Sequence, residues 1–403
     1  MRKFTGLKLV PKSIWAIGIA GFLINIATSL VFGLSTGFMR CYLGFSVGST
    51  GKIQSLVESL SYIVKFTSGI FSDVLRRRKL LMLFGFGLIV ISKPIMAFSS
   101  TVFFVFLARA IDRIGNGIQS TPRDALIGDL ASKESRGQSF GLRQTLTYIG
   151  SSLGALLSIY MMIWTNSNYK FIFMLAGIPC LIAIIFLTFF VPDPIADEKK
   201  VSFRGKLSIM RQEVKILEKH YWKLILVVFV FMLCRYGEAP LVLTALEKLH
   251  LPENYAATVN ICYNVVTSLT AYPIGVLSDR VGRERILMLG ICCAIIANLI
   301  LAHANSLCWL YLGVAFWGAQ IAITMTIFTA LITDYSSIHL RGTALSIYYF
   351  VSFLAVLIAG HIYEFCVESF SLSAPFMVGA VFSFISLLLT LVFLRPTEKI
   401  ESH

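Results

Sequence analysis

The stretch that decides the fold is GIFSDVLRRRK, at residues 69–79, which lies between two long apolar runs. A close relative of it returns as GVLSDRVGRER at residues 275–285. Asp73 of the first copy and Asp279 of the second are 206 residues apart in a chain of 403 residues. A charged motif that returns after about half the chain indicates one structural unit that is used twice.

A second motif supports the duplication. ALIGD at residues 125–129 is followed by Arg-Gly at 136–137, and ALITD at 330–334 is followed by Arg-Gly at 341–342. The offset is 205 residues, and the two motifs keep the same order in both copies. Two independent motifs in one register therefore predict two related halves.

The composition indicates an integral membrane protein. Hydrophobic residues make up 57% of the chain and charged residues only 14%, whereas a soluble domain carries about 25% charged residues. Apolar runs of about 20 residues are long enough for a helix to cross the hydrocarbon core of a bilayer. A helix also satisfies its own backbone hydrogen bonds there. We therefore expect an all-α integral membrane fold.

Twelve apolar segments can be marked along the chain, six on each side of a polar connector. The first six are expected at about residues 13–37, 48–72, 80–98, 102–118, 139–164 and 171–191. The second six are expected at about residues 221–245, 256–277, 286–302, 307–332, 344–363 and 374–394. We predict two pseudo-symmetric six-helix bundles, at residues 1–192 and 221–403, and a connector at residues 193–220. Apolar and basic residues at helical spacing between 203 and 219 predict an amphipathic helix on the membrane surface.

The distribution of Lys and Arg predicts the orientation. Basic residues cluster at the N-terminus, at residues 76–79, 123–143 and 280–285, in the connector and at the C-terminus. All of these positions lie on one side of a twelve-helix path, and basic loops stay on the cytoplasmic side of a membrane. We expect both termini in the cytoplasm. The net charge of +14 then reflects topology and contact with membrane lipids, and it does not indicate nucleic acid.

Sites of other classes are not supported by the sequence. None of the eight cysteines lies in a CxxC pair, and no Ser/His/Asp or metal-ligating group of residues stands out. The chain has no GxxxxGK[ST] motif, which argues against transport driven by ATP. We therefore expect no enzyme activity, no cofactor and no metal.

The residues resemble a known family over nearly the whole chain. Twelve helices in two halves, a long connector and the GxxxD motifs with trailing arginines are similar to the major facilitator superfamily (MFS). RAIDRIGNGI at residues 109–118, followed by PRDAL at 122–126, resembles a narrower bacterial subgroup whose members are mostly known only as transporters. The resemblance implies a monomeric secondary transporter of a bacterial inner membrane. It also implies a small-molecule substrate and a proton or another coupling ion.

The resemblance implies a gate as well. In this family, charge networks at the cytoplasmic helix ends hold the two halves together and release them when the protein opens inward. The candidate gating residues are Gly69, Asp73, Arg76, Asp129, Arg136, Gly275, Asp279, Arg280, Arg283, Asp334 and Arg341. The alternative is that the arginines only set the topology. We expect both, with the gate role mainly on Asp73 and Asp279, and the partner arginine of Asp73 stays open.

Charges inside the apolar segments predict the substrate site. A charge at mid-membrane depth costs roughly 2.5–3.5 kcal/mol on insertion scales, so it normally faces the bundle interior with a partner. Arg109, Asp112 and Arg113 share one helical face, where the alternatives are a coupling or anion site and a structural ion network. Lys93 is expected to reach towards the headgroups. The candidate substrate and coupling residues are Arg109, Asp112, Arg113, Arg143, Arg235, Glu238 and Gln320.

Three functions remain open at this point. The surplus of buried arginine over carboxylate favours uptake or exchange of a small organic anion. Proton-driven efflux of drugs or metabolites is the alternative, weakened because Thr147 and Gly154-Ala155 depart from the family's efflux pattern. A non-transporting receptor on the same scaffold is disfavoured, because a receptor needs no duplicated gate.

Overall fold

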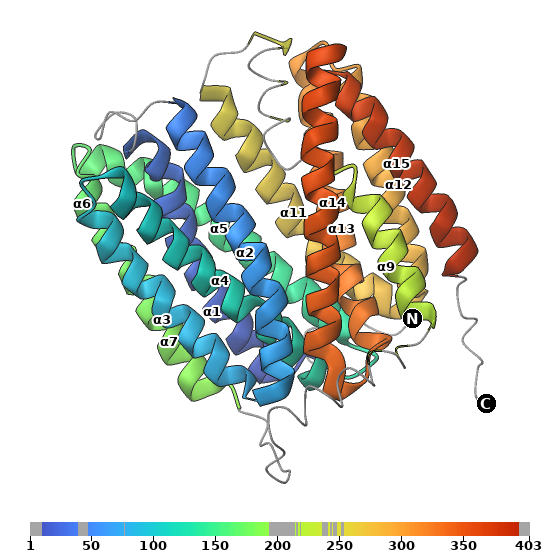
Figure 1. Ribbon diagram of the computed structural model, residues 1–403, viewed down its shortest axis with the longest axis horizontal. Coiled ribbons are helices and arrows are strands. Elements are labelled where there is room, and N and C mark those ends of the chain that lie inside the picture. The colour runs from blue at the N-terminus through green and yellow to red at the C-terminus, as the bar shows by residue number, and fades with distance from the viewer. Residues whose placement is uncertain are drawn as a thin grey trace.

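A computed structural model describes residues 10–38, 47–75, 77–192, 214, 217, 219–235, 241, 244, 248–250 and 254–394. Most of the predicted connector helix lies outside these residues, and so do the predicted gating residue Arg76 and the predicted site residue Glu238. The described part of the chain is helical and makes twelve passes through the molecule (Figure 1).

The first half makes six passes. They are α1 (Lys12–Gly37), α2 (Val47–Leu75), α3 (Arg78–Ala97), α4 (Val102–Leu130), α5 (Arg136–Trp164) and a last pass in two pieces, α6 (Tyr169–Leu175) and α7 (Gly177–Phe190). Over both halves, nine helical segments among the described residues are long and apolar enough to cross a membrane. The charged residues inside α4 explain why it is not among them.

The second half repeats this plan. Its helices are α9 (Lys219–Met232), α11 (Asn254–Val281), α12 (Arg283–Ala302), α13 (Leu307–Asp334), the short 3-10 helix η4 (Ile338–Leu340), α14 (Arg341–Ser369) and α15 (Ala374–Phe393). The helices α12, α13, α14 and α15 each begin 205 residues after α3, α4, α5 and α6. The spacing of the two sequence motifs is therefore the spacing of the helices that carry them.

Two helices differ most from their predicted bounds. The fourth segment was expected to end near residue 118, but α4 runs to Leu130 with Pro122 inside it, so Arg123 and Asp124 are helical and buried. Their mutual ion pair makes this burial possible. The seventh segment was expected to reach residue 245, but α9 ends at Met232 and Arg235 follows it. Gly237 and Pro240 lie just beyond, and both residue types disfavour a continuing helix.

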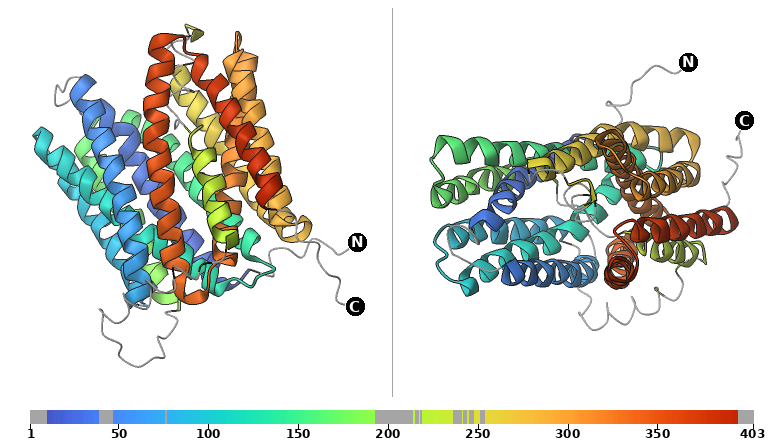
Figure 2. Two further views of the ribbon diagram at one scale, coloured as in Figure 1. Left: turned by 45° about the vertical axis from the view of Figure 1, so that its right-hand side comes forward. Right: turned by 90° about the horizontal axis from the view of Figure 1, so that it is seen from above.

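Most of each apolar core lies within one half, and two pairs of helices make the most extensive contacts between the halves, while α13 also contacts α5 and α14 contacts α4. α2 packs against α14, and α5 packs against α11. Figure 2 shows the two groups of helices from the side and from above. The outer helices expose large apolar side chains such as Phe189 on α7 and Val392 on α15. Such exposed apolar surface is what a lipid-facing helix requires.

Candidate functional site

At one end of the bundle, a carboxylate of the first half binds the start of a helix in the second. Asp73, on the last turn of α2, accepts hydrogen bonds from the backbone N–H groups of Gly342 (3.1 Å) and Thr343 (2.6 Å), at the start of α14. Arg78 donates to the same carboxylate over 3.2 Å. Asp73 is buried, so these contacts replace water around its charge.

The second half returns the same contact to the first. Asp279, near the end of α11, accepts hydrogen bonds from the backbone N–H groups of Gly137 (2.9 Å) and Gln138 (2.8 Å), at the start of α5. Arg283 donates to it over 3.1 Å. The predicted gate role of the two aspartates therefore has matching geometry in both copies.

Four more ion pairs complete this arrangement. Two join the halves: Arg136 to Asp334 (2.6 Å), and Arg341 to Asp129 (2.7 Å). Two more lie within the halves: Arg78 to Asp129 (2.8 Å), and Arg283 to Asp334. We call these charged side chains, Asp73, Asp279 and the starts of α5 and α14 the latch, and this end of the bundle the latch end. Four aspartates and four arginines thus compensate one another.

Glycines let the two halves approach backbone to backbone beside the latch. A Cβ added at Gly342 would lie 2.6 Å from the carbonyl oxygen of Gly69. One added at Gly137 would lie 2.8 Å from the carbonyl oxygen of Gly275. Real Cβ atoms do not come so close to an oxygen, so these contacts need glycine on both sides. Predicted residues Gly69 and Gly275 therefore each meet a glycine of the other half.

Two of the predicted gating residues are not placed in the latch. Arg76 lies outside the described residues, and among the residues that the structure describes the arginine paired with Asp73 is Arg78. Arg280 is exposed at the latch end of α11. The duplication itself points to Arg78, because this residue stands 205 residues before Arg283.

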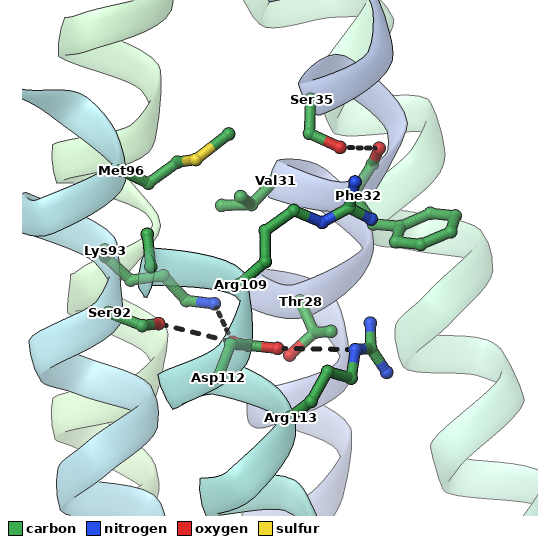
Figure 3. Close-up of a pocket in the computed structure, with 11 residues that line it drawn as sticks. Thr28, Val31, Phe32, Ser35, Ser92, Lys93, Met96, Arg109, Asp112 and Arg113 are labelled. Carbon is green, nitrogen blue, oxygen red and sulfur yellow. Dashed lines mark hydrogen bonds and ion pairs between the residues drawn. The ribbon is translucent and has the colours of Figure 1, made fainter. Parts of the chain in front are cut away.

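Inside the first half, α1, α3 and α4 enclose a pocket with polar walls (Figure 3). Its volume is about 20 Å³, which is room for about one water molecule. It brings together the predicted residues Arg109, Asp112 and Arg113. The lining residues are Thr28, Val31, Phe32, Ser35, Ser92, Lys93, Met96, Ala108, Arg109, Asp112 and Arg113.

Lys93 is the counter-ion of Asp112 in this pocket. Its Nζ lies 2.6 Å from Asp112 Oδ1, the Ser92 hydroxyl donates to the same oxygen over 3.3 Å, and Arg113 Nε lies 3.9 Å from Oδ2. Lys93 is only 1% exposed, so the prediction that it reaches the headgroups is wrong. A carboxylate on the neighbouring helix holds the ammonium inside, because leaving either charge unpaired in the interior would cost more.

The two arginines of the pocket lie close to an aromatic ring, that of Phe32. The guanidinium carbons of Arg109 and Arg113 lie 5.2 and 5.6 Å from the ring centroid of Phe32. Such cation–π contacts hold a guanidinium without neutralising it. Phe32 is 41% exposed. It borders the pocket on the side away from Lys93, as Figure 3 shows.

Arg143 belongs to a different cluster, around Asp124. The Asp124 Oδ1 atom lies 3.0 Å from Arg123 Nε and 3.5 Å from Arg143 Nε, and Oδ2 accepts a 2.7 Å hydrogen bond from the Tyr349 hydroxyl. Tyr349 lies on α14, so this cluster joins the two halves. The structure does not bring Arg143 into the pocket of Arg109 and Arg113 that Figure 3 shows.

A second pocket lies in the other half, between α9, α12 and α13. It holds about 10 Å³ and includes the predicted residues Arg235 and Gln320. These three helices occupy the places in the second half that α1, α3 and α4 occupy in the first. Lys93 and Asn298, one in each pocket, are 205 residues apart, which is the offset between α3 and α12. Within the described residues, the buried side-chain oxygen of Gln320 has no hydrogen-bond partner.

A search for known relatives identifies the family. The model described as Major Facilitator Superfamily matches residues 17–246 and 224–403. The chain belongs to the major facilitator superfamily. An uncharacterized MFS-type transporter, MJ1317 of Methanocaldococcus jannaschii, is 27% identical over 391 residues, which are 95% of each chain.

Solved MFS structures share the fold. The human organic anion transporter MFSD10 matches with a TM-score of 0.77 at 16% identity, over 94% of this chain and 99% of that one. The proton:xylose symporter XylE matches with a TM-score of 0.76 at 16% identity, over 98% and 97% of the chains. At this identity the likeness shows the fold and not the solute. This MFS chain is thus a multi-pass secondary transporter, not an enzyme.

Proposed function

We propose that this protein transports a small organic anion together with protons. The charge of the first-half pocket carries the proposal: Lys93 and Arg113 face one carboxylate, Asp112. Among the described residues of this group, two cations and one anion leave a net charge of +1. A buried net charge is unfavourable, so a carboxylate or phosphate group of a solute would be stabilised beside these residues.

The size of the pocket limits how the solute binds. Because about 20 Å³ is room for about one water molecule, only a small polar group can enter. The Arg113 side chain is 20% exposed and borders the pocket together with Phe32. The anionic group would therefore meet Arg109 and Arg113, whose planar guanidinium groups suit a carboxylate. The rest of the solute would lie between the halves.

The other predicted site residues take supporting roles in this proposal. Arg235 and Gln320 would bind the opposite end of the solute from the second half, with Glu238 as the partner of Arg235. Asp112 would offset one of the two positive charges, those of Lys93 and Arg113, when no solute is bound. Arg143 we assign to coupling rather than to the solute, because it pairs with Asp124.

The latch would set which side is open. We infer that the latch end faces the cytoplasm of a bacterial inner membrane, because the basic residues gather there. Residues 1–192 and 221–403 would move against each other, while the connector at 193–220 contacts lipid. The motif at 109–126 favours the bacterial subgroup with this pattern. We expect a monomer, because each half finds its partner within the same chain.

Thermal-shift and calorimetric binding assays on the purified protein test the solute class. The panel contains small carboxylates, inorganic phosphate and a lipophilic cation. Arg113→Gln should weaken binding of the preferred anion about 10- to 150-fold, because a hydrogen bond to a charged group contributes about 1.5–3 kcal/mol. Arg77→Gln is the matched control, because Arg77 is exposed and its loss should change binding little.

The alternative has a distinct signature. A proton-driven exporter would bind the lipophilic cation, and protons would compete with it. If the cation binds and no anion does, or if Arg113→Gln leaves anion binding intact, the anion proposal fails. Efflux then replaces it.

A further inference from the structure

A further buried carboxylate, Asp124, lies where the two halves meet. It is 0% exposed, in the part of α4 beyond Pro122. Its two oxygens contact three donors: Arg123 Nε at 3.0 Å, Arg143 Nε at 3.5 Å and the Tyr349 hydroxyl at 2.7 Å. A carboxylate that is buried so completely needs such donors to stay ionised.

The donors do not all belong to one half. Arg123 is on α4 and Arg143 on α5, so both travel with Asp124. Tyr349 is on α14 of the other half, with Lys65 Nζ of α2 5.4 Å from the centroid of its ring. Among the described residues, these are the charged and titratable groups that face Asp124 from α2, α4, α5 and α14.

Separation of the halves therefore changes the proton affinity of Asp124. While the latch is closed, the Tyr349 hydroxyl stabilises the ionised carboxylate. When α14 moves away, that hydrogen bond is lost and the two arginines remain. A hydrogen bond to a charged group is strong enough to move a titration by about one to two pH units. By linkage, a proton on Asp124 favours separation to the same extent.

We propose that Asp124 is a proton-binding site that couples protonation to the release of the latch end. A proton from water on the open side binds one carboxylate oxygen, the charge-assisted bond from Tyr349 is lost, and the halves separate. The proton leaves to water on the other side as the carboxylate ionises again. Only this O–H bond forms and breaks. The inference rests on the proton coupling in the proposed function and adds the residue that performs it.

Infrared difference spectroscopy of the full-length protein in lipid tests the proposal, with pH as the variable. A C=O band of a protonated carboxyl should appear as pH falls, and Asp124→Asn should remove it. Glu134→Gln, at an exposed carboxylate outside both pockets, is the matched control and should keep it. Tyr349→Phe should move the midpoint of this band up by about one to two pH units. The double variant Arg136→Gln/Arg341→Gln lacks both inter-half ion pairs. Adding Tyr349→Phe to this double variant should not shift the midpoint of the band further.

Each other outcome overturns the proposal. A band that persists in Asp124→Asn, or none across the pH range in which the protein stays folded, shows that Asp124 binds no proton. An equal midpoint of the band in the wild type and in Tyr349→Phe shows that the second half does not affect the protonation of Asp124. The titration uses no solute, so its result does not depend on whether an anion binds. Failure to bind any anion would therefore refute the proposed solute class without refuting proton binding at Asp124.

Discussion

Replacing Asp73 by Asn should release the latch without unfolding the protein. Asn loses the charge and keeps only one acceptor oxygen, whereas Gly342 and Thr343 donate to different oxygens of Asp73, so one of the two hydrogen bonds is lost. A hydrogen bond to a charged group contributes about 1.5–3 kcal/mol and a neutral one about 0.5–1.5 kcal/mol, so one lost bond and one weakened bond together remove about 3 kcal/mol. That corresponds to about a 150-fold change in the ratio of closed to released latch. Asp279→Asn should do the same from the other half.

The population can be measured directly. Two spin labels, one on each half at the latch end, report a distance distribution by pulsed electron spin resonance. The longer distance should gain population in both variants, while expression and membrane insertion stay near normal, because the residues lie at the helix ends.

Glu134→Gln is the matched control for charge. Glu134 is exposed in the loop between α4 and α5, and hydrogen bonds from its own backbone N–H and the Ser132 side chain lower its pKa. Its replacement removes a charge at the same end and costs only a solvent-screened attraction to Arg136 and Arg283, so the distribution should change little. If Asp73→Asn and Asp279→Asn behave like this control, the aspartates do not hold the halves together. The motifs then only set topology.

Three further outcomes follow from the same contacts. Gly137→Leu should keep the latch from closing in the spin-label assay. Gly87→Leu should not, because a Cβ at Gly87 has no atom within 4 Å. Equal effects of the two variants would show that the close backbone approach is unimportant. Lys93→Met should lower the free energy of unfolding by about 3–5 kcal/mol, because it leaves the buried Asp112 without its counter-ion. Adding Asp112→Asn should recover part of this loss. No recovery would contradict the ion pair. Arg136→Gln should raise the released fraction about fivefold, for about 1 kcal/mol of lost pairing, and an unchanged fraction would mean that this pair adds nothing.

The sequence reveals the frame of the molecule because its motifs repeat. The offset between Asp73 and Asp279 predicted the two halves, and the latch geometry is what such a repeat requires. The positions of Arg109, Asp112 and Arg113 on one helical face also hold, because that relation is local to one helix. Periodicity and repetition are properties of the chain itself, so they can be recovered without coordinates.

Contacts between helices were the part that the sequence did not reveal. Lys93 and Asp112 lie on different helices, and only the packing of α3 on α4 brings them to 2.6 Å. The fourth segment was expected to end near residue 118, which left Asp124 outside it, and in the structure α4 continues past Pro122 to Leu130. Its bond to Tyr349 spans 225 residues. No local pattern encodes such a partner.

The latch also determines how two helices begin. The residues flanking the starts of α5 and α14, Ser135 and Leu340, give those helices no side-chain hydrogen bond. Asp279 and Asp73 instead bind the N–H groups of the second and third helical residues, the positions that an N-cap side chain normally serves. Each half therefore supplies the N-cap of a helix in the other. When the halves part, both helices lose their caps together, so the first turns of α5 and α14 should fray and exchange their amide hydrogens as the transporter opens.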